Sequence, residues 1–146
     1  MLHDAFNQFS DAQAVTATAL SANVLELGVT RNIGAGEEVN LTVLVTETVT
    51  SGGASTVTFT LETDDDAGLA SPVVLATTVA IPKATLVAGF RAVDGVAVPA
   101  ASYERFLALR YTVGGAALST GKFSAWLHKG RFDTRVFASG RTNLAG

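Results

Sequence analysis

The sequence predicts an all-β fold, a sandwich or a barrel, and three observations support this. Residues 56–62 alternate completely between apolar and polar or threonine side chains, and residues 39–46 do so except at Leu44, as expected of strands whose successive side chains face opposite sides of a sheet. The threonines in these runs favour strands because a branched Cβ suits a pleated surface. Several further short candidate strands are separated by turns rich in glycine or proline, a spacing typical of sandwiches and barrels.

Each element follows from its local pattern. Residues 50–55 predict a hairpin turn between the two alternating runs, because Gly52 and Gly53 adopt positive φ without strain. Five further strands are expected in short apolar runs, at residues 23–27, 73–76, 85–90, 105–113 and 122–128. Residues 10–13 fit a helical capping box, but the β-branched alternation of residues 15–18 favours extended structure there.

The chain is expected to form one domain, residues 1–146, which is long enough to bury a hydrophobic core. No repeat or linker divides it. The two ends, about residues 1–10 and 131–146, lack apolar alternation and are interpreted as extended arms. Their aromatic side chains need a surface to pack on, either the chain's own sandwich or another subunit. These aromatic residues are Phe6, Phe9, Phe132 and Phe137.

The composition favours a protein that contacts other proteins. Charged residues make up 16% of the chain, against about 25% in typical soluble domains. Four basic residues near the C-terminus are too dispersed to indicate a nucleic-acid site, and an acidic protein surface suits them at least as well. They are Lys129, Arg131, Arg135 and Arg141. No apolar run approaches the length of a transmembrane helix, and the N-terminus lacks signal-peptide features, so we expect no membrane partner and synthesis in a cytoplasm.

No residue pattern indicates catalysis, a cofactor or a metal site. The chain has no cysteine, and its histidines, His3 and His128, have no companions at ligand spacing. No nucleophile motif such as G-x-S-x-G is present. We therefore expect no enzymatic activity and no cofactor.

Two features allow more than one interpretation. The consecutive residues Asp64, Asp65 and Asp66 match no calcium loop, so a solvated acidic turn is expected and cation binding is left open. Trp126 alternates with Phe123 and its apolar neighbours; if these face inward, Trp126 faces outward as an interface anchor or a carbohydrate platform. A strand register shifted by one residue would place Trp126 in the core.

Three segments carry a resemblance to a known family. Residues 9–14 (Phe-Ser-Asp-Ala-Gln-Ala), 23–28 (Asn-Val-Leu-Glu-Leu-Gly) and 31–37 (Arg-Asn-Ile-Gly-Ala-Gly-Glu) resemble the opening of a bacteriophage capsid cement family, of the type found in a Bordetella phage. By motif the resemblance covers roughly residues 1–40, and beyond them it rests on length, strand rhythm and the acidic run. Asn32 stands where the family pattern has an aspartate, which puts a salt bridge at that position in doubt.

The resemblance implies a jelly-roll-like antiparallel β-sandwich on the outer surface of a phage head. Its partners would be the major capsid protein, whose subunits it bridges, and further copies of itself, with a dimer favoured over a trimer. The candidate capsid or oligomer contacts are aromatic and basic side chains of the arms, together with the tryptophan: Phe6, Phe9, Trp126, Arg131, Phe132, Arg135, Phe137 and Arg141. The alternative is a carbohydrate- or receptor-binding module of a virion appendage, which requires Trp126 and Tyr103 or Tyr111 to share an exposed face.

Overall fold

A computed structural model describes residues 5–28, 31–33 and 38–129 of the chain. These residues form twelve strands and one turn of 3-10 helix. In chain order the elements are η1 (Ala5–Asn7), β1 (Gln8–Ala14), β2 (Ala19–Leu20), β3 (Leu25–Glu26), β4 (Arg31–Ile33), β5 (Val39–Ser51), β6 (Ser55–Asp64), β7 (Val73–Thr77), β8 (Ile81–Pro82), β9 (Arg91–Ala97), β10 (Ala101–Tyr103), β11 (Phe106–Gly115) and β12 (Leu118–Lys129). Within these residues no helix is long and apolar enough to cross a membrane.

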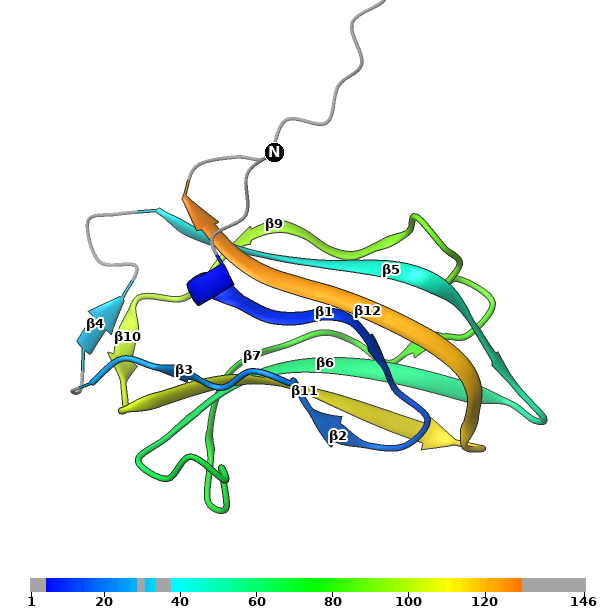
Figure 1. Cartoon of the computed structure of the whole chain (residues 1–146), viewed down its shortest axis with the longest axis horizontal. Coiled ribbons are helices and arrows are strands. Elements are labelled where there is room, and N and C mark those ends of the chain that lie inside the picture. Colours follow the sequence, from blue (N-terminus) through cyan, green and yellow to red (C-terminus); the bar gives the residue numbers. More distant parts are fainter. Residues whose placement is uncertain (1–4, 29–30, 34–37, 130–146) are drawn as a thin grey trace, which may run out of the picture.

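Two antiparallel sheets pack face to face (Figure 1). Sheet A has the order β1-β12-β5-β9, and sheet B has the order β2-β11-β6-β7, with β3 beside β11 and β8 beside β6. When the principal strands are counted in chain order, with β2 and β3 taken as one, the sheets read 1-8-3-6 and 2-7-4-5. This is the jelly-roll arrangement, so the predicted antiparallel β-sandwich is confirmed. Strands β4 and β10 form a separate small pair.

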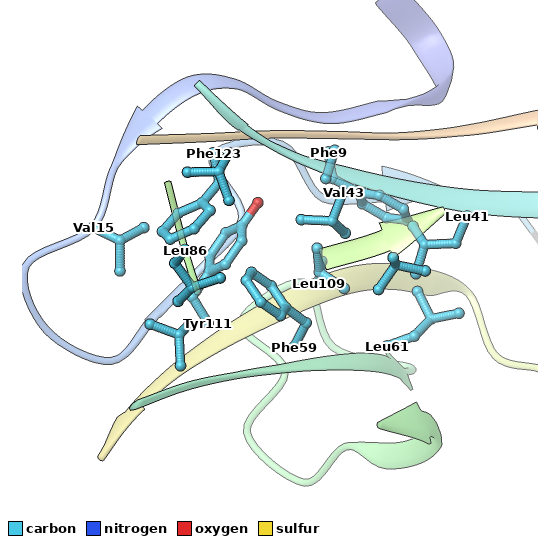
Figure 2. Packing of buried hydrophobic residues seen from close by; sticks show 14 of the residues in the cluster. Phe9, Val15, Leu41, Val43, Phe59, Leu61, Leu86, Leu109, Tyr111 and Phe123 are labelled. Carbon is cyan, nitrogen blue, oxygen red and sulfur yellow. The ribbon is translucent and has the colours of Figure 1, made fainter. Parts of the chain in front are cut away.

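The two longest alternating runs form the β5–β6 hairpin, as predicted. Their apolar positions point between the sheets, where Val43, Val45, Phe59 and Leu61 are almost fully buried (Figure 2). Complete burial of a side chain of this size contributes roughly 1.5–3 kcal/mol. The alternation therefore specifies both the strand conformation and the face that packs on the other sheet.

Three aromatic rings from different strands form the centre of the core (Figure 2). Tyr111 of β11 stacks on Phe123 of β12 with ring centroids 5.4 Å apart. Phe59 of β6 meets both rings edge-on, at 5.8 Å from Tyr111 and 5.3 Å from Phe123. Offset-stacked and edge-on pairs are the favoured aromatic geometries, so this cluster holds the two sheets together.

One predicted strand is wrong. Residues 85–90 form consecutive turns, in which the amides of Leu86 and Phe90 donate to the carbonyls of Lys83 and Val87, each three residues earlier in the chain. The apolar character of this run has another cause, because Leu86 is fully buried in the core. Strands occur within the other predicted runs, although residues 23–27 contain only the two-residue β3.

The N-terminal arm is shorter than predicted. Strand β1 begins at Gln8, and Phe9 is fully buried in the core. Two register shifts interrupt the pairing of β1 with β12, and Ala12 adopts a positive φ of 45° within the second shift, between Ser10 and Gln13. Such bulges break the period-two pattern, which explains why β1 shows no alternation in the sequence. The preference for extended structure over a helix at residues 10–13 is confirmed.

Candidate interaction surface

The described contact candidates occupy three different environments. Phe6 lies in η1, which contacts β12, and its side chain is 87% exposed. Phe9 belongs to the core, so its prediction as a surface contact is wrong. Trp126 lies on the outer face of sheet A, opposite to the inward-facing Phe123 and Ala125, yet it is only 7% exposed. The remaining candidates lie outside the described residues; these are Arg131, Phe132, Arg135, Phe137 and Arg141.

A polar network occupies the outer face of sheet A beside Trp126. In the strand register Trp126 lies opposite Thr42 of β5, which is fully buried. The Thr42 hydroxyl lies 2.9 Å from Nε2 of His128 and accepts a hydrogen bond from the Gly95 amide at 3.1 Å. This network therefore ties the three strands β12, β5 and β9 together on the side of sheet A that faces away from the core.

The exposed aromatic row required by a carbohydrate platform is absent from the described residues. Tyr103 and Tyr111 are both fully buried, and Trp126 is nearly so. The Tyr103 hydroxyl donates to the carbonyl of Pro99 at 2.7 Å, and burial raises the pKa of Tyr103. These tyrosines therefore act in packing. The glycan-binding alternative required one of them on an exposed face with Trp126, and the structure does not provide that face.

The acidic run after β6 has a structural role at its first residue. One carboxylate oxygen of Asp64 accepts a hydrogen bond from the Ser71 amide at 2.9 Å, and the other accepts one from the Asp66 amide at 3.3 Å. The hydrogen bond from Ser71 is the main cause that holds the pKa of Asp64 below its usual value. Asp64 is buried, whereas Asp65 and Asp66 are exposed, so the expected solvated turn is wrong for Asp64.

No cluster of three His, Cys, Asp or Glu residues suited to a metal ion occurs within the residues that the structure describes. The loop that Asp64 closes folds back onto sheet B instead. Leu69 is 2% exposed, and its carbonyl accepts a hydrogen bond from Nη2 of Arg110 at 3.5 Å. Arg110 in turn contacts both carboxylate oxygens of Glu62 through Nε, at 2.9 Å each. The loop therefore covers part of the outer face of sheet B.

One side of the sandwich is sealed by hydrogen bonds between the edges of the two sheets. The Asn23 amide donates to the Phe9 carbonyl at 2.9 Å. Nε2 of Gln13 donates to the Leu20 carbonyl at 2.9 Å, while its Oε1 accepts from the Ala22 amide at 2.7 Å. These bonds join β1 to the segment around β2, so the core is closed along this side.

On the opposite side of the sandwich, β9 of sheet A and β7 of sheet B are the edge strands (Figure 1). The turn around Leu86 closes one end, where the Val49 amide donates to the Leu86 carbonyl at 2.9 Å. A groove of about 470 Å³ remains between the two edge strands. Its lining includes the core residues Leu41, Phe59 and Leu61, together with Ala76 of β7 and Val96 of β9.

Residues 72–98, which we call the valine side, form this side of the sandwich and the rim of its groove. Only three of these residues are charged, namely Lys83, Arg91 and Asp94. Arg91 and Asp94 pair with each other at 2.9 Å, and Nζ of Lys83 donates to the carbonyls of Ser51 and Gly53.

The valine side also carries five of the six large hydrophobic residues that are exposed in the described part of the chain. Exposed valines are 47–81% accessible there, at positions Val73, Val74, Val79, Val87 and Val96. Apolar surface beside unpaired strand edges is typical of a protein–protein contact. The sequence does not reveal this surface, because the exposed valines lie in separate short segments that only the fold brings together.

Comparison with known proteins identifies the family of the chain. No curated protein matches the sequence. The family model described as Bbp16 matches residues 9–127, well over half of the chain, and Bbp16 is the name of a Bordetella phage protein. The matched range contains both sheets except for Gln8 at the start of β1 and for His128 and Lys129 at the end of β12. The predicted resemblance to a Bordetella phage family is therefore confirmed, and the chain belongs to the Bbp16 family.

Proposed function

We propose that this protein is a capsid cement, or decoration, protein that binds the outside of a phage head and bridges major capsid protein subunits. The observation that carries the proposal is membership of the Bbp16 family, because it connects the chain to a phage. The apolar valine side supports it, since a nearly uncharged surface with exposed valines suits contact with another protein. In this proposal the protein acts by binding alone, without catalysis.

The proposed mechanism is preferential binding to the assembled shell. A protein that binds the shell but not the dissociated subunits stabilises the shell by mass action. Many copies on one lattice strengthen a modest contact through effective concentration. The proposal includes self-association, with a dimer favoured over a trimer, and a location on the outer capsid surface of the virion. It includes no membrane and no nucleic-acid partner.

The terminal residues are the proposed contacts. Phe6 presents an exposed ring beside β12. In the C-terminal segment, we propose that Phe132 and Phe137 anchor the segment itself, while Arg131, Arg135 and Arg141 meet an acidic protein surface. The low charge of the valine side and the basic character of this segment make them complementary kinds of contact, one apolar and one electrostatic.

The proposal is tested with purified protein and phage heads that lack it. We expect saturable co-sedimentation with the heads and a higher temperature of head disruption when the protein is bound. Heads that bind no protein at micromolar concentration, or that bind it without any gain in stability, contradict the proposal. Binding to a glycan array combined with no binding to heads favours the appendage alternative.

A truncation tests the proposed contacts. Deletion of residues 131–146 is expected to weaken head binding while thermal unfolding stays cooperative, since the strands that the structure describes in both sheets lie within residues 8–129. The matched control replaces Arg131, Arg135 and Arg141 by Gln within the full chain, which tests charge without removing the aromatic residues. Unchanged head affinity of the truncated protein contradicts the assignment of these contacts.

A further inference from the structure

The groove between β7 and β9 has a shape that suits a single extended segment. It lies between the edges of two sheets, so an occupant has to be narrow enough to enter a two-layer gap. A strand of a second sandwich carries its own second sheet on one face and does not fit. Asp94 and Gly95 oppose the single residue Thr42 in a β-bulge, and bulged edges resist pairing with the same edge of another copy.

We propose that residues 132–138 of this chain's C-terminal segment occupy the groove. The segment Arg131-Phe-Asp-Thr-Arg-Val-Phe-Ala138 carries all its charges at odd positions, whereas its even positions hold only phenylalanine, threonine, valine and alanine. In an extended segment these two sets face opposite sides. One face is therefore uncharged and matches the apolar groove, and the other keeps Arg131 and Arg135 in solvent.

The end of β12 places this segment within reach. Lys129 pairs with Val39, and the Val98 amide donates to the Val39 carbonyl at 2.9 Å. Lys129 thus lies about two strand spacings, roughly 10 Å, from Val98 at the end of the groove. The seventeen residues after Lys129 can extend over roughly 56 Å, and β9 is only about 24 Å long. A segment entering at Val98 runs antiparallel to β9.

Docking of residues 132–138 in the groove removes the apolar groove surface from water and buries no unpaired charge. Val96 is 58% exposed and lines the groove with Ala76 on the opposite wall. The Arg91–Asp94 pair on the rim is already neutralised, so an uncharged face is the suitable complement. The segment can come from the same chain or from a neighbouring copy, and in the second case it links two copies.

Engineered disulfides test the proposal in the full-length protein, which has no cysteine of its own. Val96→Cys is combined with Val136→Cys, and oxidised glutathione serves as the oxidant. We expect this disulfide to form severalfold faster than that of two matched controls. One control combines Val96→Cys with Arg135→Cys, on the opposite face of the segment. The other combines Ala14→Cys, an exposed residue at the other edge of sheet A, with Val136→Cys.

The outcomes separate the possible occupants. A fast disulfide within one chain, or between the two single variants when they are mixed, supports the proposal. Equal rates for the test pair and either control overturn it. A disulfide-linked dimer of the Val96→Cys single variant also overturns it, because the groove edge then faces the same edge of a second copy. Unchanged thermal unfolding shows that each variant is folded.

This proposal and the proposed function fail independently. The disulfide rates are measured on purified protein in the absence of heads, and head binding is measured separately. If the wild-type protein binds heads but the test and control disulfides form at equal rates, the cement function is supported and the groove proposal is contradicted. If the test disulfide forms faster than the controls but the wild-type protein does not bind heads, the groove proposal is supported and the cement function is contradicted.

Discussion

The hydroxyl oxygen of Ser10 in β1 lies 2.5 Å from the phenol oxygen of Tyr111 in β11. Both residues are fully buried, so this hydrogen bond joins sheet A to sheet B inside the apolar core (Figure 2 shows the Tyr111 oxygen among the core side chains). The Tyr111 ring also stacks on Phe123. One tyrosine therefore contributes both aromatic packing and the polar contact that fixes β1 against the opposite sheet.

Tyr111→Phe is expected to lower the free energy of unfolding by roughly 1–2 kcal/mol, because the buried Ser10 hydroxyl loses its partner. Ser10→Ala is expected to have a similar effect for the reciprocal reason. The double variant should cost less than the sum of the two single variants, since both partners of the bond are then absent. Urea unfolding of the four proteins gives these values, and strictly additive effects would show that the hydrogen bond is not formed.

The same tyrosine predicts how stability responds to alkaline pH. Burial raises the pKa of Tyr111 to about 12 from a usual value of 10.0. The neutral phenol is therefore favoured in the folded state, and its contribution is complete below pH 10 and is lost as the pH rises towards 12, by about 1.4 kcal/mol per pH unit at most. Absorbance at 295 nm should show delayed ionisation of tyrosine, and Tyr111→Phe should remove this component. Ionisation of both tyrosines at pH 10 would contradict the prediction.

The hydrogen bonds of Asp64 predict how the stability of the protein changes at acidic pH. Its pKa is lowered, chiefly by the hydrogen bond from the Ser71 amide, so its contribution to stability is present above the usual value of 3.8 and is lost as the pH falls through the lower folded value. Asp64→Asn should destabilise the protein at pH 7 and reduce the loss of stability between pH 5 and pH 3. The exposed neighbour provides the control, because Asp65→Asn should leave the acid limb unchanged. Equal behaviour of the two variants in unfolding experiments would disprove the role of Asp64.

Two arginine–glutamate pairs allow a matched comparison of buried and exposed charges. In the Arg110–Glu62 pair the side chains are 27% and 6% exposed, whereas in the Arg105–Glu26 pair they are 53% and 52% exposed. Arg110→Met leaves a buried carboxylate without its cation and should cost about 3 kcal/mol. Arg105→Met should cost at most about 1 kcal/mol, as is usual for surface pairs. Comparable costs in urea unfolding would contradict the assigned difference in burial.

The sequence predicts those parts of the fold in which apolar side chains that face the core alternate with mostly polar side chains on the other face of the strand. Strands β5 and β6 show this pattern, and they were correctly predicted. The pattern fails where the backbone departs from regular pairing. The bulged strand β1 hides the core residue Phe9, and the turns at residues 85–90 look like a strand because Leu86 enters the core from a loop.

The candidate surface is predictable to a smaller extent. Alternation correctly places Trp126 on the outer face of sheet A, but the pattern gives no information on how deeply neighbouring chain segments cover that face. The valine side arises from residues of β7, β9 and two turns, brought together by strand order. That order depends on long-range pairing, which no local pattern in the sequence records.

The last strand of this jelly roll lies inside a sheet. β12 separates β1 from β5, and its partner β1 begins more than one hundred residues earlier. During synthesis β1 therefore has no neighbour in its sheet until residues 122–126 of β12 have left the ribosome. Such distant pairing slows folding, and an incomplete chain exposes Phe9 and Val43 to water. Cooperative folding therefore requires β12, and we expect a chain that terminates within β12 to be susceptible to proteolysis.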